Sequence, residues 1–220
     1  MPEIDYTQLT EWDTPALSNA LRRELGADRQ AHTDGSLRQV AGGRFVGTAV
    51  TATMRAAAPG QDGIPVSELH RAVLAAGQPA VVVMQDLDEI PGAGAFLGEV
   101  NGTLLDALGI AGFITNGRVR DEPELQRMGF AVHAAGLCVA RSHMRLTAIG
   151  VPVRVAGLDV APGDLLHGDQ HGALRIPLAA VDRLPALAEA IREEEQSIIT
   201  WARSSDFTVD GLLALKRVKH

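Results

Sequence analysis

The chain has 220 residues, of which 46% are hydrophobic, and its formal net charge is -7. This length predicts one large domain with its own core, and the acidic balance argues against direct binding to nucleic acid. The single cysteine, Cys138, excludes an intrachain disulfide, and its apolar neighbours favour a buried, inert thiol over a nucleophile. The sequence has no apolar run of membrane-spanning length and no signal-peptide pattern, so we expect a cytoplasmic protein without a membrane partner.

The first predicted element is a helix over about 14–26. Thr14 suits the N-cap position, Pro15 suits the first turn, and Gly26 suits the C-terminal stop. The apolar residues between them recur at helical spacing and form one stripe, which comprises Ala16, Leu17, Ala20, Leu21 and Leu25. The polar, glycine-bearing residues 27–43 that follow predict a loop.

Two strands and a helix are predicted next. Residues 45–54 are rich in β-branched side chains and predict a strand, and residues 67–76 predict a helix. The continuous apolar run over 80–85 predicts a strand buried on both faces. Three carboxylates follow that run and are compatible with a metal site, but a solvated acidic loop is the favoured interpretation of Asp86, Asp88 and Glu89.

The stretch over 98–124 is the centre of the sequence. It reads GEVNGTLLDALGIAGFITNGRVRDEPE, which predicts a helix, a strand over 111–115, a loop at Asn116-Gly117 and the start of another helix. Glu99 begins the first of these helices, and Arg120-Asp121 follows the strand. Such junctions gather charged groups at one edge of a sheet, where ligands of open α/β folds bind.

The residue types at these junctions suit metal-assisted chemistry on an oxygen-rich substrate. Carboxylates hold a hard cation such as Mg2+, which keeps several of its waters. An arginine offers a planar fork of donors to a carboxylate or to a developing enolate. Free backbone N–H groups after Gly98 could hold an anion at the helix N-terminus.

A structural interpretation of the same residues is also open. Asp121-x-x-Glu124 resembles a capping box with Asp121 at the N-cap position, and Pro123 is tolerated in a first turn. Arg120 could pair with Glu124 at i,i+4 spacing on the helix surface.

The remainder of the chain predicts further strands and a helical end. An apolar run covers 130–139, and strands are predicted over 151–155, 158–160, 165–167 and 173–176. Residues 178–220 form a predicted C-terminal helical extension, which Pro185 interrupts. A solvated acidic face is the simplest interpretation of its carboxylates, which are Glu189, Glu193, Glu194 and Glu195.

The spacing of Glu99, Arg120-Asp121 and Glu124 resembles the signature of the RraA-like family. The resemblance continues downstream through Gly129–Val132, Pro162–Asp164, Gly168–Gly172 and Ile176–Pro177. The family includes class II pyruvate aldolases that act on 4-hydroxy-4-methyl-2-oxoglutarate and 4-carboxy-4-hydroxy-2-oxoadipate, and it includes the RraA regulators of ribonuclease E.

This resemblance implies a fold and an assembly. Residues 1–220 are expected to form one RraA-like α/β domain with a layered β/β/α fold, similar to the swivelling phosphohistidine domain, with helices at both ends. The family also implies a homotrimer or homohexamer with its sites between subunits.

The resemblance further implies a divalent-metal-dependent lyase that cleaves a C–C bond of a small 2-oxo acid. The reaction would be retro-aldol cleavage giving pyruvate, oxaloacetate decarboxylation, or both. Asp121 would bind Mg2+ or Mn2+, Glu99 and Glu124 would hold its waters, and Arg120 would stabilise the enolate. The implied catalytic residues are thus Glu99, Arg120 and Asp121, and the implied substrate-binding residues are Gly98, Val100, Asn101, Arg120 and His143. The alternative is a non-catalytic RraA-type regulator that binds a ribonuclease.

Three features bear on the choice between these functions. The aldolases are expected to carry a lysine near Met144 and the family an aspartate in place of His171, so both positions depart from the pattern. His143, Arg141 or Arg145 could replace the lysine's charge. The aldolases place a glutamate of a C-terminal helix in the neighbouring subunit's site, whereas the short regulators lack that extension, so its presence here favours an enzyme.

Overall fold

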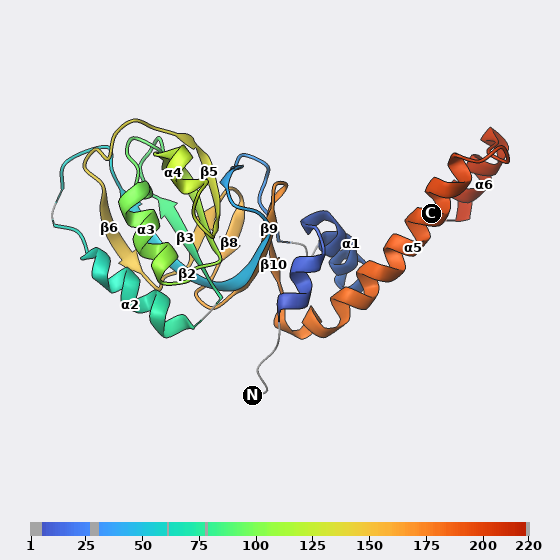
Figure 1. Ribbon diagram of the computed structural model, residues 1–220, viewed down its shortest axis with the longest axis horizontal. Coiled ribbons are helices and arrows are strands. Elements are labelled where there is room, and N and C mark those ends of the chain that lie inside the picture. The colour runs from blue at the N-terminus through green and yellow to red at the C-terminus, as the bar shows by residue number, and fades with distance from the viewer. Residues whose placement is uncertain (1–5, 27–30, 61, 78, 219–220) are drawn as a thin grey trace.

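The computed structural model describes residues 6–26, 31–60, 62–77 and 79–218. Its centre is a sheet of eight strands in the order β1-β5-β4-β3-β2-β9-β10, with β6 paired to the end of β2 (Figure 1). The strands of this sheet are β1 (Arg38–Ala41), β2 (Phe45–Arg55), β3 (Ala80–Asp86), β4 (Gly112–Val119), β5 (Ala131–Leu137), β6 (Arg145–Ile149), β9 (Leu165–Asp169) and β10 (Gly172–Ile176). Strands β2 to β5 run parallel, so their carboxyl ends lie at one edge of the sheet.

The sheet is covered on both faces. A hairpin of β7 (Val153–Val155) and β8 (Leu158–Val160) lies on one face, where Leu158 and Val83 belong to the same apolar cluster. Helices α2 (Val66–Ala76) and α3 (Glu99–Ala107) cover the other face, where Leu69, Leu105 and Phe113 share a second cluster. The predicted layered β/β/α arrangement is therefore confirmed, and one-turn α4 (Glu122–Leu125) follows β4.

The helices at the two ends of the chain pack against each other on β9 and β10. They are η1 (Thr7–Glu11), α1 (Thr14–Leu25), η3 (Leu178–Arg183), α5 (Leu184–Ala202) and α6 (Val209–Val218). Leu17, Leu174 and Ile191 belong to the apolar cluster that joins these helices to the sheet. Figure 1 shows that the outer half of α5 leaves the body and carries α6 at its tip. The outer residues 192–197 are accordingly all exposed.

Several local predictions need correction. The N-cap of α1 is Asp13, whose Oδ1 accepts a hydrogen bond from Ala16 N at 2.7 Å, rather than Thr14. The region predicted as a loop over 27–43 contains β1, although residues 27–30 lie outside the described residues. Pro185 is the second residue of α5 and does not interrupt that helix, because a backbone N–H in the first turn has no intrahelical partner to lose.

The loop predicted at Asn116-Gly117 is also wrong, because both residues lie within β4. Asn116 side-chain atoms bond both backbone groups of Asp86: Oδ1 accepts from Asp86 N at 2.8 Å and Nδ2 donates to Asp86 O at 3.0 Å. The amide side chain thus replaces a backbone partner between β3 and β4, and the strand continues through an irregular register to Arg118.

Candidate active site

The charged centre lies where β4 ends and α3 begins. Arg120 N donates to Leu97 O at 3.1 Å, and Glu99 N donates to Asp121 Oδ2 at 2.9 Å. The Arg120 Nε atom lies 3.4 Å from the same Asp121 oxygen. The structure therefore brings together Gly98, Glu99, Arg120 and Asp121, four residues that the sequence places in two separate segments.

The backbone around this centre has little freedom. A Cβ atom at Gly98 would lie 2.5 Å from Asp121 Oδ2 and 2.9 Å from Arg120 Cγ, so only glycine permits this approach. Asp121 itself has φ 56° and ψ 45°, in the left-handed region. Aspartate is one of the few residues that visits this region, and such strain is typical of functional positions.

The structural interpretation is correct in placing Asp121 at the N-cap of α4 and wrong in the side-chain contacts of Asp121 and Glu124. The Asp121 side chain makes no capping hydrogen bond to α4, and its carboxylate instead accepts from the first N–H of α3. Glu124 pairs with Arg127 at 3.1 Å rather than with Arg120. The Asp121 carboxylate, with Arg120 beside it, thus binds the start of α3 instead of α4.

The donor set fits a divalent cation held by one protein carboxylate better than a cage of three. Among the described residues, no group of three or more histidine, cysteine, aspartate or glutamate side chains is placed to hold a metal ion. Asp121 Oδ1 makes no hydrogen bond in the described part of the chain, and the side chain of Glu99, whose backbone N–H binds Asp121 Oδ2, is exposed and also unpaired there. One direct carboxylate and several waters are an ordinary arrangement for Mg2+. The assignments of Glu99 and Glu124 to the metal's waters remain predictions.

The start of α3 offers backbone donors next to Asp121. Within the described chain the first intrahelical bond runs from Gly102 N to Gly98 O, at 2.8 Å, so the N–H groups of Val100 and Asn101 are left without a partner. The Asn101 side chain is engaged elsewhere, because its Nδ2 donates to Phe96 O at 2.7 Å. The backbone N–H of Asn101, next to that of Val100, is available to a substrate anion.

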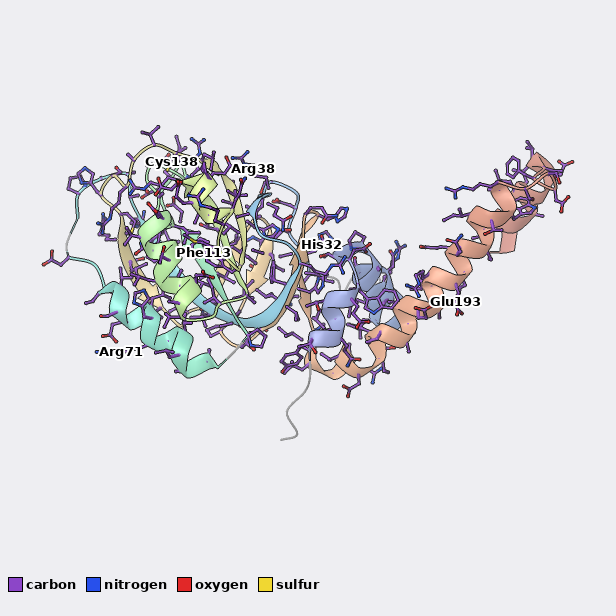
Figure 2. All side chains as sticks on the ribbon, in the orientation of Figure 1. His32, Arg38, Arg71, Phe113, Cys138 and Glu193 are labelled. Atoms are coloured by element: carbon purple, nitrogen blue, oxygen red, sulfur yellow. The ribbon has the colours of Figure 1, made fainter. Side chains whose placement is uncertain are left out.

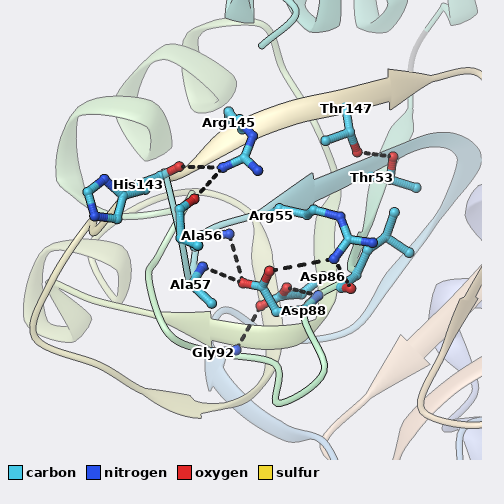
Figure 3. Close-up of polar contacts among 12 residues, drawn as sticks. Thr53, Arg55, Ala56, Ala57, Asp86, Asp88, Gly92, His143, Arg145 and Thr147 are labelled. Atoms are coloured by element: carbon cyan, nitrogen blue, oxygen red, sulfur yellow. Dashed lines mark hydrogen bonds and ion pairs between the residues drawn. The ribbon is translucent and has the colours of Figure 1, made fainter. Parts of the chain in front are cut away.

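Asp86 and Asp88, at the end of β3, organise the neighbouring loops (Figure 3). Asp86 is 2% exposed and accepts from Asp88 N and Gly92 N, at 3.0 and 2.7 Å. Asp88 Oδ2 accepts from Ala56 N and Ala57 N, both at 2.7 Å. Burial raises the pKa of the Asp86 carboxyl above its ordinary value. The prediction of a solvated acidic loop is wrong for this pair, which fixes the loops that flank the site.

His143 and Arg145 lie on the other side of that network. Figure 3 shows the His143 ring pointing away from Asp86 and Asp88. His143 N donates to Ala56 O at 3.2 Å, and the structure shows no contact of its ring with Arg120 or Asp121 in the described residues. Arg145 donates to Ala58 O at 2.7 Å and so holds a loop, while Met144 is buried in the core. A substrate-binding role for His143 remains a prediction.

His171, together with His167 close to it, belongs to the seam between α1 and the sheet. Buried His167 Nδ1 lies 3.1 Å from Thr14 Oγ1, and Asp169 Oδ2 accepts from Thr14 N at 2.8 Å. His171 Nδ1 lies 3.0 Å from Asp169 Oδ1. Burial lowers the pKa of His167 to about 4, so its imidazole is neutral near pH 7. These residues attach the N-terminal helix and lie at β9, away from the end of β4.

Cys138 lies beside the candidate site, at the end of β5. Its backbone N–H donates to Val119 O at 2.9 Å. Burial raises the pKa of its thiol, although the positive charges of Arg118 and Arg120 act in the opposite direction. The thiol is thus partly buried and protonated near neutral pH, which agrees with an inert cysteine.

The C-terminal glutamates differ from one another. Glu194 forms a two-bond ion pair with Arg23 of α1, at 2.9 and 2.8 Å, and Glu189 pairs with Arg192. Glu193 is exposed on the outer half of α5, away from the sheet (Figure 2). Within one chain, none of these side chains contacts Asp121 in the described residues.

The fold and the charged centre define an α/β protein whose candidate site lies at the carboxyl edge of parallel strands. A family model described as RraA-like, Aldolase/RraA, matches residues 14–175. The chain therefore belongs to the RraA-like family, as its sequence motifs predicted.

Individual relatives resemble different branches of this family. A Halalkalibacterium halodurans protein, named provisionally as a 4-hydroxy-4-methyl-2-oxoglutarate aldolase, is 38% identical over 73 residues, or 32% of this chain and 34% of that protein. The chain thus matches about a third of the length of this curated relative. The structure of Streptomyces coelicolor RraAS2, described as an unusual member of the RNase ES inhibitor RraA family, has a TM-score of 0.70 at 23% identity and covers 92% of this chain and 98% of its own.

A third comparison concerns the length of the C-terminal extension. The RNA-processing inhibitor RraA of Thermus thermophilus matches with a TM-score of 0.56 and 22% identity, over 73% of this chain and 95% of its own. The Streptomyces protein covers enough of this chain to include part of residues 178–220. In the described residues no helix has the length and apolar character needed to cross a membrane.

Proposed function

We propose that this protein is a divalent-metal-dependent lyase that cleaves a C–C bond of a 2-oxo acid, by retro-aldol cleavage to pyruvate or by decarboxylation of oxaloacetate. The observation that carries the proposal is the Arg120-Asp121 pair, which the strained backbone of Asp121 aims at the open start of α3 instead of at its own helix. The aldolase name of the Halalkalibacterium relative supports the same chemistry.

Each residue of the centre has a role in this proposal. Asp121 would hold Mg2+ or Mn2+ through Oδ1, and the bound ion would polarise the substrate's 2-oxo group as a Lewis acid. The backbone N–H groups of Val100 and Asn101 bind the substrate carboxylate at the helix N-terminus. Arg120 presents its planar fork to the oxygen that becomes negative as the C–C bond breaks. Glu99 is the exposed carboxylate that would orient a water to accept the substrate hydroxyl proton.

The test is pyruvate release from a panel of 2-oxo acids, measured with Mg2+, Mn2+ or EDTA. Asp121→Asn is the sharpest variant, because asparagine also tolerates the left-handed backbone but lacks the charge. We expect its turnover to fall by about 10²-fold or more, and Arg120→Lys to be severely impaired, because a point charge cannot replace the fork. Glu122→Gln, in the same turn, is the matched control. Turnover that resists EDTA and both variants would refute the assigned centre.

The second candidate function is binding to a ribonuclease without catalysis. The match of the Streptomyces inhibitor-family protein over nearly its whole length favours it, as does the net charge of -7, which suits a basic partner. Calorimetry with a ribonuclease E-type enzyme discriminates the two. Equally tight binding by the native protein and Asp121→Asn, without turnover of any 2-oxo acid, would establish the regulator instead.

We also propose that the protein works as a homotrimer or homohexamer, in which α5 of one subunit reaches the centre of another. The support is the outer half of α5, which makes few contacts with its own body and carries an exposed Glu193. The exposed apolar side chains farther along, Ile199, Phe207, Val209 and Leu213, would then be covered by a second subunit.

A further inference from the structure

A pocket of about 420 Å³ opens beside the candidate centre, and Arg118 is its one positively charged lining residue among those described. Ile90, Pro91 and Ala93 supply apolar walls, and Glu89 supplies a negative charge at the pocket's edge. The loop that forms these walls is fixed from behind, because Gly92 N donates to the buried Asp86 carboxylate at 2.7 Å. The pocket is therefore formed by an anchored loop.

Arg118 and Arg120 lie close together at the end of β4. They are two residues apart on either side of Val119, the fully buried last residue of that strand, so in extended backbone their Cα atoms lie about 7 Å apart. The positive charges of both act on the Cys138 thiol. A single loop contacts both side-chain stems: Cβ atoms at Gly92 and Gly98 would lie 2.6 Å from Arg118 Cγ and 2.9 Å from Arg120 Cγ. The pocket is thus the direct neighbour of the Arg120-Asp121 centre.

The two arginines differ in their partners. The Arg120 guanidinium lies beside Asp121, at 3.4 Å. Arg118 is exposed and makes neither an ion pair nor a hydrogen bond through its side chain in the described part of the chain. An arginine whose stem is held by a loop and whose fork is unpaired is suited to a carboxylate ligand.

We propose that Arg118, together with the pocket walls, is the residue that binds the far carboxylate of the substrate in a second subsite. This inference rests on the proposed function, because the 2-oxo end is placed at Arg120 and Asp121. The apolar walls contact the methylene groups between the two ends. Glu89 opposes the binding of an anion in this pocket and weakens it.

The inference predicts affinities for a matched pair of ligands, 2-oxoglutarate and 2-oxohexanoate, measured by calorimetry on the full chain with Mg2+. These acids have chains of similar length, but only the first has a far carboxylate. Arg118→Gln should weaken 2-oxoglutarate binding about tenfold and leave 2-oxohexanoate binding unchanged. Glu89→Gln should strengthen 2-oxoglutarate binding, which is the opposite of the effect expected for Arg118→Gln. Arg71→Gln removes an equal charge from α2, at a residue that does not line the pocket, and should change neither.

Oxalate, which resembles the 2-oxo acid end alone, separates failure of this inference from failure of the proposed function. Oxalate binding that Asp121→Asn abolishes would support the Arg120-Asp121 centre. If Arg118→Gln then weakens the binding of both 2-oxo acids equally, or of neither, the second subsite is refuted and the centre is retained. If neither oxalate nor either 2-oxo acid binds the native protein, the proposed function and the second subsite fall together.

Discussion

Asp121 joins the start of α3 to the segment that follows β4 through one side chain. Its Oδ2 atom receives the first N–H of α3 and lies beside Arg120, which leaves Oδ1 as the oxygen without a hydrogen bond in the described residues. The negative charge at the helix start is favourable to the helix dipole, so the same contact stabilises α3 and orients the carboxylate. A metal ligand held this way needs no further side chain to fix its direction.

The close approach at Gly98 predicts a sharp effect of one methyl group. In Gly98→Ala the new Cβ would meet Asp121 Oδ2 at 2.5 Å, so the carboxylate or α3 must move. We expect turnover to fall by about 10²-fold, because a displacement on the order of 1 Å misplaces the reacting groups. Pyruvate release measures the loss, and circular dichroism should show an unchanged fold.

Gly43→Ala is the control for this substitution, since no atom lies within 4 Å of a Cβ placed there. Equal turnover in the Gly98 and Gly43 variants would show that the contact between Gly98 and Asp121 has no part in catalysis.

At the scale of the element, sequence periodicity predicts the buried strands well and the exposed or irregular ones poorly. The residues of β2 and β3 are almost wholly buried, so their β-branched and apolar composition predicts both strands from the sequence. β6 is only partly buried, and its RLTAI sequence has no clear period, so no strand was predicted there. β4 extends past Asn116 because a side chain on that strand pairs with the backbone of Asp86, which no local pattern reveals.

The candidate site also divides into contacts that the sequence predicts and contacts that it does not. The meeting of Glu99 with Arg120 and Asp121 could be predicted, because helix starts and the ends of parallel strands share one edge of a sheet. The roles of Asp86 and Asp88 in fixing the flanking loops could not, because the backbone groups they bind belong to distant or irregular segments.

The seam between α1 and β9 predicts a pH-dependent stability. Burial, with a smaller contribution from the positive charge of Arg44, lowers the folded-state pKa of His167 to about 4, against an ordinary value of 6.5, while the carboxylate of Asp169 acts in the opposite direction. The unfolded chain therefore binds the proton first as the pH falls. Stability is fully present above about pH 6.5 and is lost as the pH falls toward 4. Between pH 7 and pH 5 this histidine should contribute a loss of about 2 kcal/mol in the free energy of unfolding.

Urea unfolding at the two pH values measures this contribution. His167→Gln should lose part of the pH dependence, whatever its stability at pH 7, while His143→Gln, at an exposed position, should keep the native dependence. Burial also lowers the pKa of His133, so some dependence of the same sign should remain. Identical pH dependence in the native protein and His167→Gln would show that His167 is not the group responsible.

At the scale of the whole molecule, α5 divides into an inner half that completes the fold and an outer half that does not. Ala188 and Ile191 are buried against the end helices, so a chain cut after Leu184 would lose part of its core. A chain cut after Arg192 keeps those contacts and loses the exposed pair of Arg23 with Glu194, which stabilises by at most about 1 kcal/mol. The second truncation therefore removes Glu193 and the apolar tip without unfolding the body.

The last prediction uses this truncation to test whether sites are shared between subunits. We expect light scattering to give masses in multiples of three for the full chain and for the chain cut after Arg192, because the body carries the main interface in this proposal. The truncated chain lacks the glutamate it would lend to a neighbour, and Asp121→Asn lacks its own metal ligand. Each protein alone should be nearly inactive.

Mixed trimers of these two chains distinguish a site built from two subunits from a site built within a single subunit. A site built from Asp121 of a truncated subunit and Glu193 of an Asp121→Asn neighbour has both groups intact. Random mixing in equal amounts should then restore about a quarter of the native pyruvate release, since about one site in four combines the two chains in the productive order. Single Glu193→Gln and Glu194→Gln variants refine the result, because Glu194 is already held by Arg23 and should matter less. No gain of activity on mixing, in trimers that light scattering and mass spectrometry show to be hybrid, would confine each site to one chain and leave the outer half of α5 without a catalytic role.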